Sequence, residues 1–176
     1  MVTVLEEAYH SILMDPPWNE RGCGRIKRGA DRHYPLLKAP EILAVILKAS
    51  VWRPAPDCHL YCWTTNNHVP DGIWLVEALG FRYITLLTWA KDRFGLGQYF
   101  RGKTEQLIFG VRGRLPAQVR NEDTLITSPR RRHSAKPEKA YEKIERVSPG
   151  PRLEMFTDIE RPGWDAWGNE ARRLFK

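Results

Sequence analysis

Hydrophobic residues recur along the chain in two patterns, as short continuous runs and as stretches with helical spacing. Continuous apolar runs are typical of strands that are covered on both faces of a sheet. They predict strands over residues 12–14, 59–64, 81–89, 106–111 and 152–156. Helical spacing, with proline in the first turn or glycine after the last, predicts helices over residues 40–49, 71–79 and 137–147. Because strands alternate with helices, we expect an α/β fold in which one mostly parallel sheet forms the middle of three layers.

Two long segments show no apolar period. Residues 19–38 and 112–135 are rich in basic residues, and the first also contains several glycines. Loops of this length in a compact domain are often lids or binding loops, so we predict two mobile basic loops. Pro54 and Pro56 are expected to break the chain, and residues 65–68 to form a polar turn at the end of a strand.

Length and composition indicate one domain. The chain has 176 residues, of which 42% are hydrophobic, enough for a single domain over residues 1–176 with a full core. No apolar run reaches the length of a membrane span and the N-terminus lacks a signal-peptide pattern, so we expect a cytoplasmic protein without membrane contact. The three cysteines cannot all pair with one another and are expected to be reduced.

The motif Cys58-His59-x-x-Cys62 is not interpreted as a metal site. A tetrahedral site needs a second pair of ligands, which the sequence lacks, and successive side chains of a strand point to opposite faces. The five histidines form no metal-binding or triad pattern either. We therefore predict no metal.

The charge of the chain favours a polyanionic partner. The formal net charge is +7, the pI is about 9.5, and basic residues cluster at positions 21–32 and 130–132. A basic surface that merely aids solubility is the simpler explanation, but the clustering favours nucleic acid. Lys27, Arg28 and Arg131 are the predicted phosphate contacts.

The strongest chemical signal is the motif Asp15-Pro16-Pro17-Trp18, directly after the predicted strand at residues 12–14. The prolines must end that strand, because they donate no N–H and favour an extended conformation in the preceding residue. Asp15 and Trp18 are thus expected at the carboxyl end of a central strand, where open α/β sheets bind ligands. The structural alternative is a proline-stiffened turn with Asp15 as a helix cap and Trp18 in the core.

These residue types suit methyl transfer to an exocyclic amine of a nucleobase. Such an amine is a poor nucleophile, because its lone pair is delocalised into the ring. The Asp15 carboxylate and the Pro16 carbonyl, held by the fixed proline φ angles, can accept its two N–H groups and favour the pyramidal geometry that frees the lone pair. Trp18 offers an indole face for base stacking, worth about 1–3 kcal/mol. We predict Asp15, Pro16, Pro17 and Trp18 as catalytic residues, with Trp18 also binding substrate.

Five segments in a fixed order resemble the MT-A70 family of S-adenosylmethionine-dependent adenine-N6 methyltransferases. They are Asp15-Pro16-Pro17-Trp18; Tyr34-Pro35 with the helix start at Pro40; Tyr61-Cys62-Trp63-Thr64-Thr65-Asn66; Gly80-Phe81 with Thr88-Trp89-Ala90-Lys91; and a C-terminal block from His133 to Glu170. The resemblance covers nearly the whole chain. The first motif alone also marks cytosine-N4 methyltransferases, so the C-terminal block makes the resemblance specific.

The resemblance implies a Rossmann-like methyltransferase fold in permuted order, with the catalytic strand first and the cofactor-binding strand, 153–156, late in the chain. It implies S-adenosylmethionine as the cofactor, with Lys136 at the methionyl carboxylate and Glu170 at the ribose hydroxyls. The implied cofactor-binding residues are Lys136, Glu154, Phe156, Thr157, Asn169 and Glu170. Tyr34 and Asn66 are expected to help Trp18 bind the target base.

The predicted function is methyl transfer from S-adenosylmethionine to the N6 amine of adenine in nucleic acid, with DNA favoured over RNA. A cytosine-N4 DNA methyltransferase is one alternative, because the same motif serves both amines. A non-catalytic nucleic-acid-binding subunit of a methyltransferase complex is another, and a basic binding domain without cofactor is a third. A homodimer or a related methyltransferase-like subunit is also compatible with the sequence.

Overall fold

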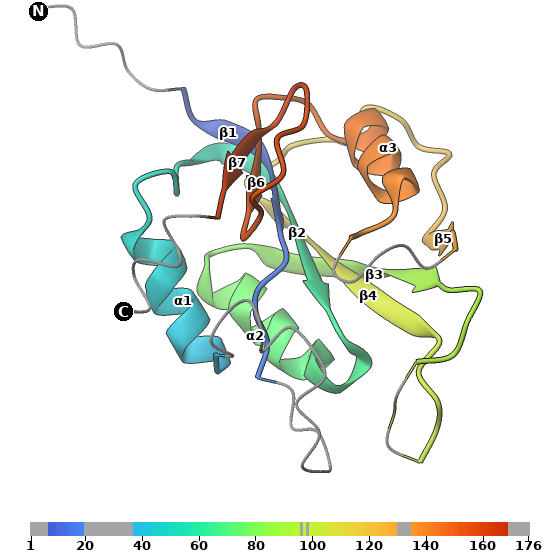
Figure 1. Cartoon of the computed structure of the whole chain (residues 1–176). Helices are drawn as coiled ribbons and strands as arrows, with labels where there is room; N and C mark the ends of the chain where they lie inside the picture. Colours follow the sequence, from blue (N-terminus) through green and yellow to red (C-terminus); the bar gives the residue numbers. More distant parts are fainter. Residues whose placement is uncertain (1–6, 20–36, 96, 98, 130–134, 169–176) are drawn as a thin grey trace, which may run out of the picture.

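The computed structural model describes residues 7–19, 37–95, 97, 99–129 and 135–168. These residues form one seven-stranded sheet in the order β5-β3-β4-β2-β1-β6-β7, with helices packed against it (Figure 1). The strands are β1 (Tyr9–Met14), β2 (Pro54–Thr64), β3 (Arg82–Ala90), β4 (Thr104–Arg112), β5 (Leu125–Thr127), β6 (Arg152–Met155) and β7 (Asp165–Trp167). The helices are α1 (Ala39–Lys48), the short 3-10 helix η2 (Asn66–His68), α2 (Val69–Ala78) and α3 (Glu138–Val147).

Strand β1 lies in the interior of the sheet, between β2 and β6 and parallel to both. Ile12 pairs with Leu60 on one side and with Leu153 on the other, and all three side chains are fully buried. A strand buried on both faces explains the uninterrupted apolar run that predicted it.

The sheet is covered on both faces. Ile12 and Met14 belong to a core cluster with residues of α1 and α2, whereas Leu13 belongs to a second cluster with residues of α3. Neighbouring side chains of a strand point to opposite faces, so the two clusters are the two sides of the sheet. The predicted three-layer α/β arrangement is therefore confirmed.

Most strand pairs are parallel, as predicted. The pairs β1–β2, β1–β6, β3–β5 and β6–β7 are parallel, and only β4 runs against its neighbours β2 and β3 within the described sheet. The carboxyl ends of β1, β2, β3 and β6 consequently meet at one edge of the sheet, together with the start of β4. The predicted catalytic motif and the predicted cofactor strand both lie at this edge.

Local signals explain where the helices begin and end. Pro40 lies in the first turn of α1, and the Glu41 carboxylate accepts the Lys38 N–H at 2.8 Å. After α2, Gly80 adopts φ +85°, the left-handed conformation that favours glycine. Pro137 caps α3, so all three predicted α-helices are confirmed to within about two residues.

Two expectations about the strands are wrong. Pro54 and Pro56 do not break the chain but lie in β2, where the pairing with β1 is irregular between Tyr9 and Ser11. Proline is tolerated at such an irregularity because no regular ladder bond is lost. The segment 112–135 was expected to be irregular, yet it contains β5, whose three residues include a single buried side chain, Ile126.

No helix in the described part of the chain is both long and apolar enough to cross a membrane.

Candidate active site

The motif Asp15-Pro16-Pro17-Trp18 leaves the sheet at the end of β1 as a tight, hydrogen-bonded turn. The Asp15 N–H donates to the carbonyl of Met155 in β6 at 3.3 Å, and the Trp18 N–H donates to the Pro16 carbonyl at 2.9 Å. The Pro17 carbonyl accepts the Leu37 N–H at 2.9 Å, which ties the start of α1 to the turn. The motif is thus fixed at the carboxyl end of β1, as predicted.

Trp18 is a structural as well as a candidate substrate residue. Its side chain is buried, and its indole N–H donates to the Trp63 carbonyl at 2.8 Å. His68 stacks on the ring, with centroids 5.6 Å apart and planes 16° from parallel. The core position that was the structural alternative for Trp18 is therefore observed, and one indole face is already covered by His68.

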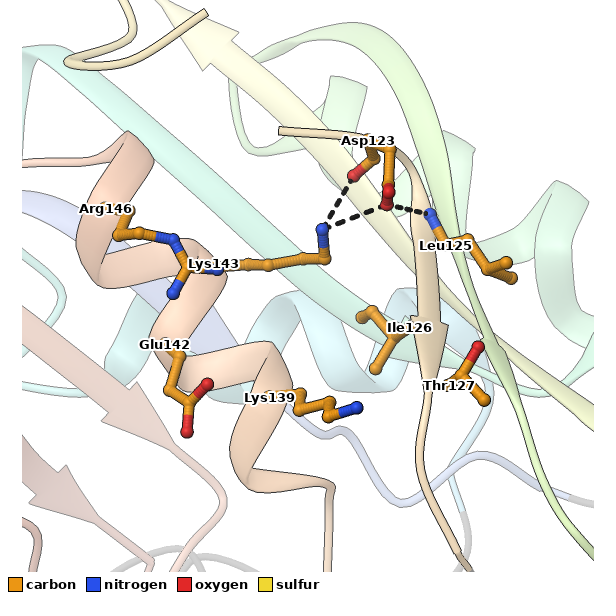
Figure 2. Close-up of a pocket in the computed structure, with 8 residues that line it drawn as sticks. All are labelled: Asp123, Leu125, Ile126, Thr127, Lys139, Glu142, Lys143 and Arg146. Atoms are coloured by element: carbon orange, nitrogen blue, oxygen red, sulfur yellow. Dashed lines mark hydrogen bonds and ion pairs between the residues drawn. The ribbon is translucent and has the colours of Figure 1, made fainter. Parts of the chain in front are cut away.

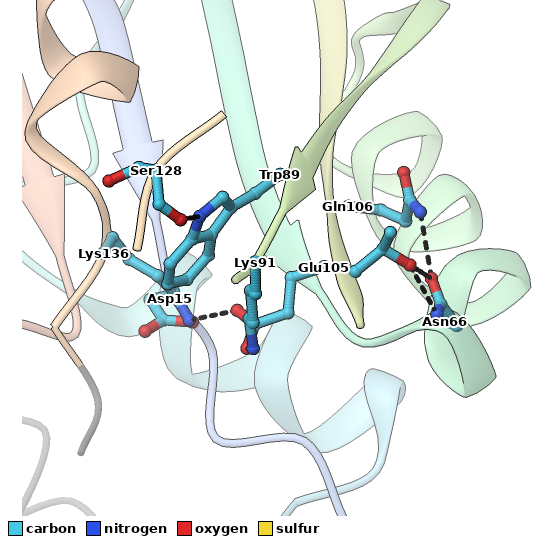
Figure 3. A network of polar contacts seen from close by, with 9 residues as sticks. Asp15, Asn66, Trp89, Lys91, Glu105, Gln106, Ser128 and Lys136 are labelled. Atoms are coloured by element: carbon cyan, nitrogen blue, oxygen red, sulfur yellow. Dashed lines mark hydrogen bonds and ion pairs between the residues drawn. The ribbon is translucent and has the colours of Figure 1, made fainter. Parts of the chain in front are cut away.

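Asp15 begins a chain of alternating charges that crosses the sheet edge (Figure 3). The Lys136 ammonium lies 3.0 Å from an Asp15 carboxylate oxygen and 3.1 Å from a Glu105 oxygen. Glu105 also pairs with Lys91. The four side chains are 14–25% exposed, so the cluster lies at the border between core and solvent.

Burial and charge set the protonation of this cluster. Burial raises the pKa of Asp15, and the attraction of Lys136 offsets part of that rise. Burial alone would lower the pKa of Lys136, but Asp15 and Glu105 outweigh it and raise the pKa. Burial would raise the pKa of Glu105, but Lys136 and Lys91 lower it. The cluster therefore holds a cationic Lys136, an anionic Glu105 and an unusually basic Asp15 carboxylate.

Lys136 lies just before Pro137, the N-cap of α3, and its ammonium lies 5.3 Å from the centroid of the Trp63 ring. The sequence assigned this lysine to the cofactor, and the structure gives its ammonium two carboxylate partners instead. An ammonium at the sheet edge still suits a carboxylate ligand, because it has three donors and a fixed positive charge. The assignment to the cofactor stays a prediction.

The end of β6 carries the second group of predicted cofactor residues. Glu154 pairs in register with Leu13 of β1, and its carboxylate accepts the Tyr141 hydroxyl at 2.7 Å in a buried position. Burial raises the pKa of Glu154. Leu13 points to the α3 face of the sheet, and its pairing partner Glu154 points to the same face. Asp15, two residues after Leu13, also lies on that face, because side chains alternate along a strand.

The chain turns sharply after β6. Phe156 has φ +67°, and the N–H groups of Phe156 and Thr157 both donate to the Trp167 carbonyl of β7, at 2.6 and 3.2 Å. The Thr157 hydroxyl accepts the N–H of Ile159 at 3.2 Å. Three predicted cofactor residues thus lie at the same edge as Asp15, Glu154 near the end of β6 and Phe156 and Thr157 in the turn that follows it.

Asn66 lies on η2 but is tied to β4. Its side-chain amide donates to Thr104 at 2.9 Å, and its carbonyl oxygen accepts from Gln106 at 2.9 Å (Figure 3). Its predicted role in base binding stays a prediction. The other predicted site residues, Lys27, Arg28, Tyr34, Arg131, Asn169 and Glu170, lie outside the described residues.

A separate cavity of about 330 Å³ lies between β5 and α3 and is lined by residues such as Ile126, Lys139 and Lys143 (Figure 2). Its walls include none of the predicted site residues. Lys143 is occupied by Glu122 and Asp123, at 2.9 and 3.0 Å. The candidate active site is therefore the Asp15 edge and not this cavity.

Comparison with known proteins identifies the family. The model of the MT-A70 family matches residues 9–170. The chain belongs to the MT-A70 family. The resemblance drawn from the sequence is confirmed, and the observed sheet is consistent with the Rossmann-like methyltransferase fold that it implied.

Three relatives show how much of this chain, and of their own length, the similarity covers. A type II methyltransferase, M.MunI of Mycoplasma sp, is 29% identical over 92% of this chain and 77% of its own length. The human N(6)-adenine-specific methyltransferase METTL4 is 26% identical over 96% of this chain and 38% of its own length. A putative N(6)-adenosine-methyltransferase of Medicago truncatula is 28% identical over 90% of this chain and 26% of its own length. The chain thus spans most of the Mycoplasma relative and well under half of the other two.

The sequence did not indicate two contacts of the candidate site. Glu105 was assigned no role from the sequence, although it joins Lys91 to Lys136. His68 was predicted only as part of the polar turn 65–68, a candidate for lining the site, and its stacking on Trp18 was not foreseen. The available signal for Glu105 was a charged residue at the start of an otherwise apolar strand. Its partners Lys91 and Lys136 are 14 and 31 residues away in the sequence, so the sequence alone did not show the pairing.

Proposed function

We propose that this MT-A70 protein transfers a methyl group from S-adenosylmethionine to the N6 amine of adenine in nucleic acid. The observation that carries the proposal is the complete Asp15-Pro16-Pro17-Trp18 turn at the carboxyl end of β1, with the Asp15 carboxylate at the sheet edge. Subunits without activity would not need all four residues. The names of the METTL4 and plant relatives favour adenine over cytosine as the base.

The turn offers two acceptors for the target amine. Asp15 can accept one N–H with its carboxylate, which is a quarter exposed. The Pro16 carbonyl accepts the Trp18 N–H with one lone pair and has a second for the other N–H of the amine. Accepting both hydrogens frees the nitrogen lone pair. Positive charge then develops on nitrogen, and a fixed carboxylate stabilises this charge in the transition state more than in the ground state.

Asp15 is also suited to hold the proton that the amine loses. Burial raises the pKa of this carboxyl, which makes its ionised form a better base than an exposed aspartate. Lys136 keeps the carboxylate ionised by attraction before the transfer. Attraction by Lys136 thus lets Asp15 accept a hydrogen bond as a carboxylate, and burial lets it then accept a proton.

The residues at the sheet edge fit S-adenosylmethionine. The cofactor carries a carboxylate and a cationic sulfonium, and the edge offers the Lys136 ammonium beside the Asp15 carboxylate, with the buried Glu154 carboxyl in the next strand. Lys136, Glu154, Phe156 and Thr157 are the described residues that would hold it, and Asn169 and Glu170 are the proposed ribose contacts. The bound cofactor supplies an electrophilic methyl group.

We propose DNA as the favoured polymer. M.MunI, the relative matched over most of its own length, is a type II methyltransferase, while the plant relatives are named for adenosine. The net charge of +7 supports a polyanionic substrate of either kind. Tyr34, Lys27, Arg28 and Arg131 remain our proposed substrate contacts, and a homodimer or a related subunit our proposed partner.

The test is methyl transfer from labelled S-adenosylmethionine to single- and double-stranded DNA and to RNA, read by nucleoside mass spectrometry. We expect N6-methyladenine, most of it in DNA, and its loss in Asp15→Ala. N4-methylcytosine would replace the proposal with the cytosine alternative. No product on any polymer, with cofactor binding retained, would contradict activity of the isolated chain.

A further inference from the structure

The hairpin that joins β3 to β4 exposes an unusual number of aromatic rings. Tyr99 and Phe100 are 105% and 88% exposed, and Phe94 is 64% exposed. Large apolar side chains rarely gather in solvent without a binding role. The surface formed by these rings and by Arg93, Arg101 and Lys103 is called the hairpin surface below.

Hydrogen bonds close the hairpin beneath these rings. The Lys91 N–H donates to the Lys103 carbonyl at 2.9 Å, and the Gly95 N–H donates to the Gly102 carbonyl at 2.6 Å. The Arg101 side chain donates to the Gly95 carbonyl at 2.8 Å. The backbone therefore pairs with itself and directs the rings outward, and the rings do not contribute to the core.

The hairpin surface is basic as well as aromatic. Arg93, Arg101 and Lys103 are exposed. The one acid in residues 92–103, Asp92, lies 3.6 Å from Arg93, whose side chain is still 84% exposed, so the surface keeps a net positive charge. The Lys103 ammonium lies 5.4 Å from the centroid of the Phe94 ring, so cation and ring share one face. Exposed rings interleaved with cations are the chemistry that binds single-stranded nucleic acid, because bases stack on the rings and phosphates pair with the cations.

A continuous chain of contacts connects the hairpin surface to Asp15. Lys91 at the base of the hairpin pairs with Glu105, Glu105 with Lys136, and Lys136 with Asp15 (Figure 3). The hairpin leaves the same sheet edge at which β1 ends. A polynucleotide with its target base at Asp15 would have neighbouring nucleotides within reach of the rings.

We propose that the hairpin surface binds unpaired nucleotides that flank the target adenine, with Tyr99 and Phe100 as stacking platforms and Arg93 as a phosphate contact. That the ligand is a nucleic acid rests on the proposed function. The hairpin surface adds that the nucleotides it binds are unpaired, in a single strand or in a locally opened duplex. The positive charge of the surface favours a polynucleotide over a protein partner, because every nucleotide carries a negative phosphate that can pair with the cations.

The test is the affinity of the full chain for a fluorescein-labelled single-stranded DNA of 20 nucleotides, measured by anisotropy, with the RNA of the same sequence and the DNA duplex in parallel. We expect the double variant Tyr99→Ala/Phe100→Ala to raise the Kd for single strands about thirtyfold or more, because two stacked bases at about 1 kcal/mol or more each are lost. The ring-preserving variant Tyr99→Phe/Phe100→Tyr is expected to bind like the wild type. Arg93→Gln is expected to reduce the slope of log Kd against log salt concentration by about 0.7, the contribution of one phosphate contact to a single strand.

Trp74→Ala is the matched control, since Trp74 is a 44% exposed aromatic on α2 outside the hairpin. Equal Kd values for the double variant and this control, or no binding of single strands by the wild type, would overturn the proposal. Unchanged binding with a change in molar mass by light scattering would assign the surface to a protein contact and also overturn it. Binding without methyl transfer would contradict the proposed function and leave the hairpin result intact.

Discussion

Among single residues, Glu105 has the clearest influence on Asp15 without belonging to the reacting motif. It shares Lys136 with Asp15, and its negative charge is one of the causes that raise the pKa of Asp15. Glu105 is therefore a positioning residue: it fixes the ammonium that faces Asp15 and tunes the proton affinity of that carboxyl.

The variant Glu105→Gln is expected to lower kcat about tenfold and to shift the pH profile. Activity needs ionised Asp15, so kcat rises with pH through the Asp15 pKa. Removing the Glu105 charge lowers that pKa, so the rising limb moves to lower pH. The measurement is kcat against pH at saturating substrates. Glu122→Gln is the matched control, because Glu122 also lies between two cations, Lys143 and Arg146, away from Asp15. A Glu105→Gln profile that coincides with the wild type would contradict this role.

Lys136 offers a test of stability at the same scale. The variant Lys136→Met leaves the Asp15 carboxylate without a cation and leaves Glu105 with Lys91 alone, and we expect a loss of about 2–4 kcal/mol in the free energy of unfolding. Without the lysine, burial and the Glu105 charge raise the pKa of Asp15 further above that of the unfolded chain. Ionisation then destabilises the fold, so the loss grows as pH rises from about 5 to 8. Urea unfolding at the two pH values measures this, and an equal loss at both would refute it.

At the scale of elements, the close approach of β7 to the turn after β6 shapes the proposed cofactor site. A Cβ atom on Gly168 would overlap the carbonyl oxygen of Thr157. Backbone cannot yield as a side chain can, so Gly168→Ala must displace the turn that holds Phe156 and Thr157.

We expect Gly168→Ala to weaken S-adenosylmethionine binding about tenfold, as measured by calorimetry, and to lower Tm by a few degrees. Ala166→Ser is the control, because Ala166 is an exposed residue of β7, two positions before Gly168. If the Gly168 variant bound the cofactor as tightly as the control does, the turn after β6 would not be part of the cofactor site.

For the molecule as a whole, elements with a strong local pattern could be predicted and contacts between distant segments could not. The apolar run at Ile12 indicated a doubly covered strand, and Gly80 indicated a helix end, because burial and φ constrain these residues locally. Strand β5 escaped prediction because it buries one side chain and owes its existence to pairing with β3.

The same distinction holds for the site. The sequence placed Asp15 at a strand end because two prolines follow it, and the fold confirms that position. The sequence could not show that Lys136 would pair with Asp15 and Glu105, since this depends on how β1, β4 and α3 converge. Nor could it show that His68 would cover one face of Trp18.

The most direct test of the whole account is the single-turnover rate of N6-methyladenine formation by Asp15→Asn, measured beside its affinity for S-adenosylmethionine. Asparagine keeps the size of the side chain but removes the negative charge that would stabilise the reacting nitrogen. We predict a rate at least about a hundredfold below the wild type, with cofactor affinity changed by less than about threefold. A variant that methylates adenine at the wild-type rate would contradict the role of Asp15 and with it the mechanism proposed for this protein.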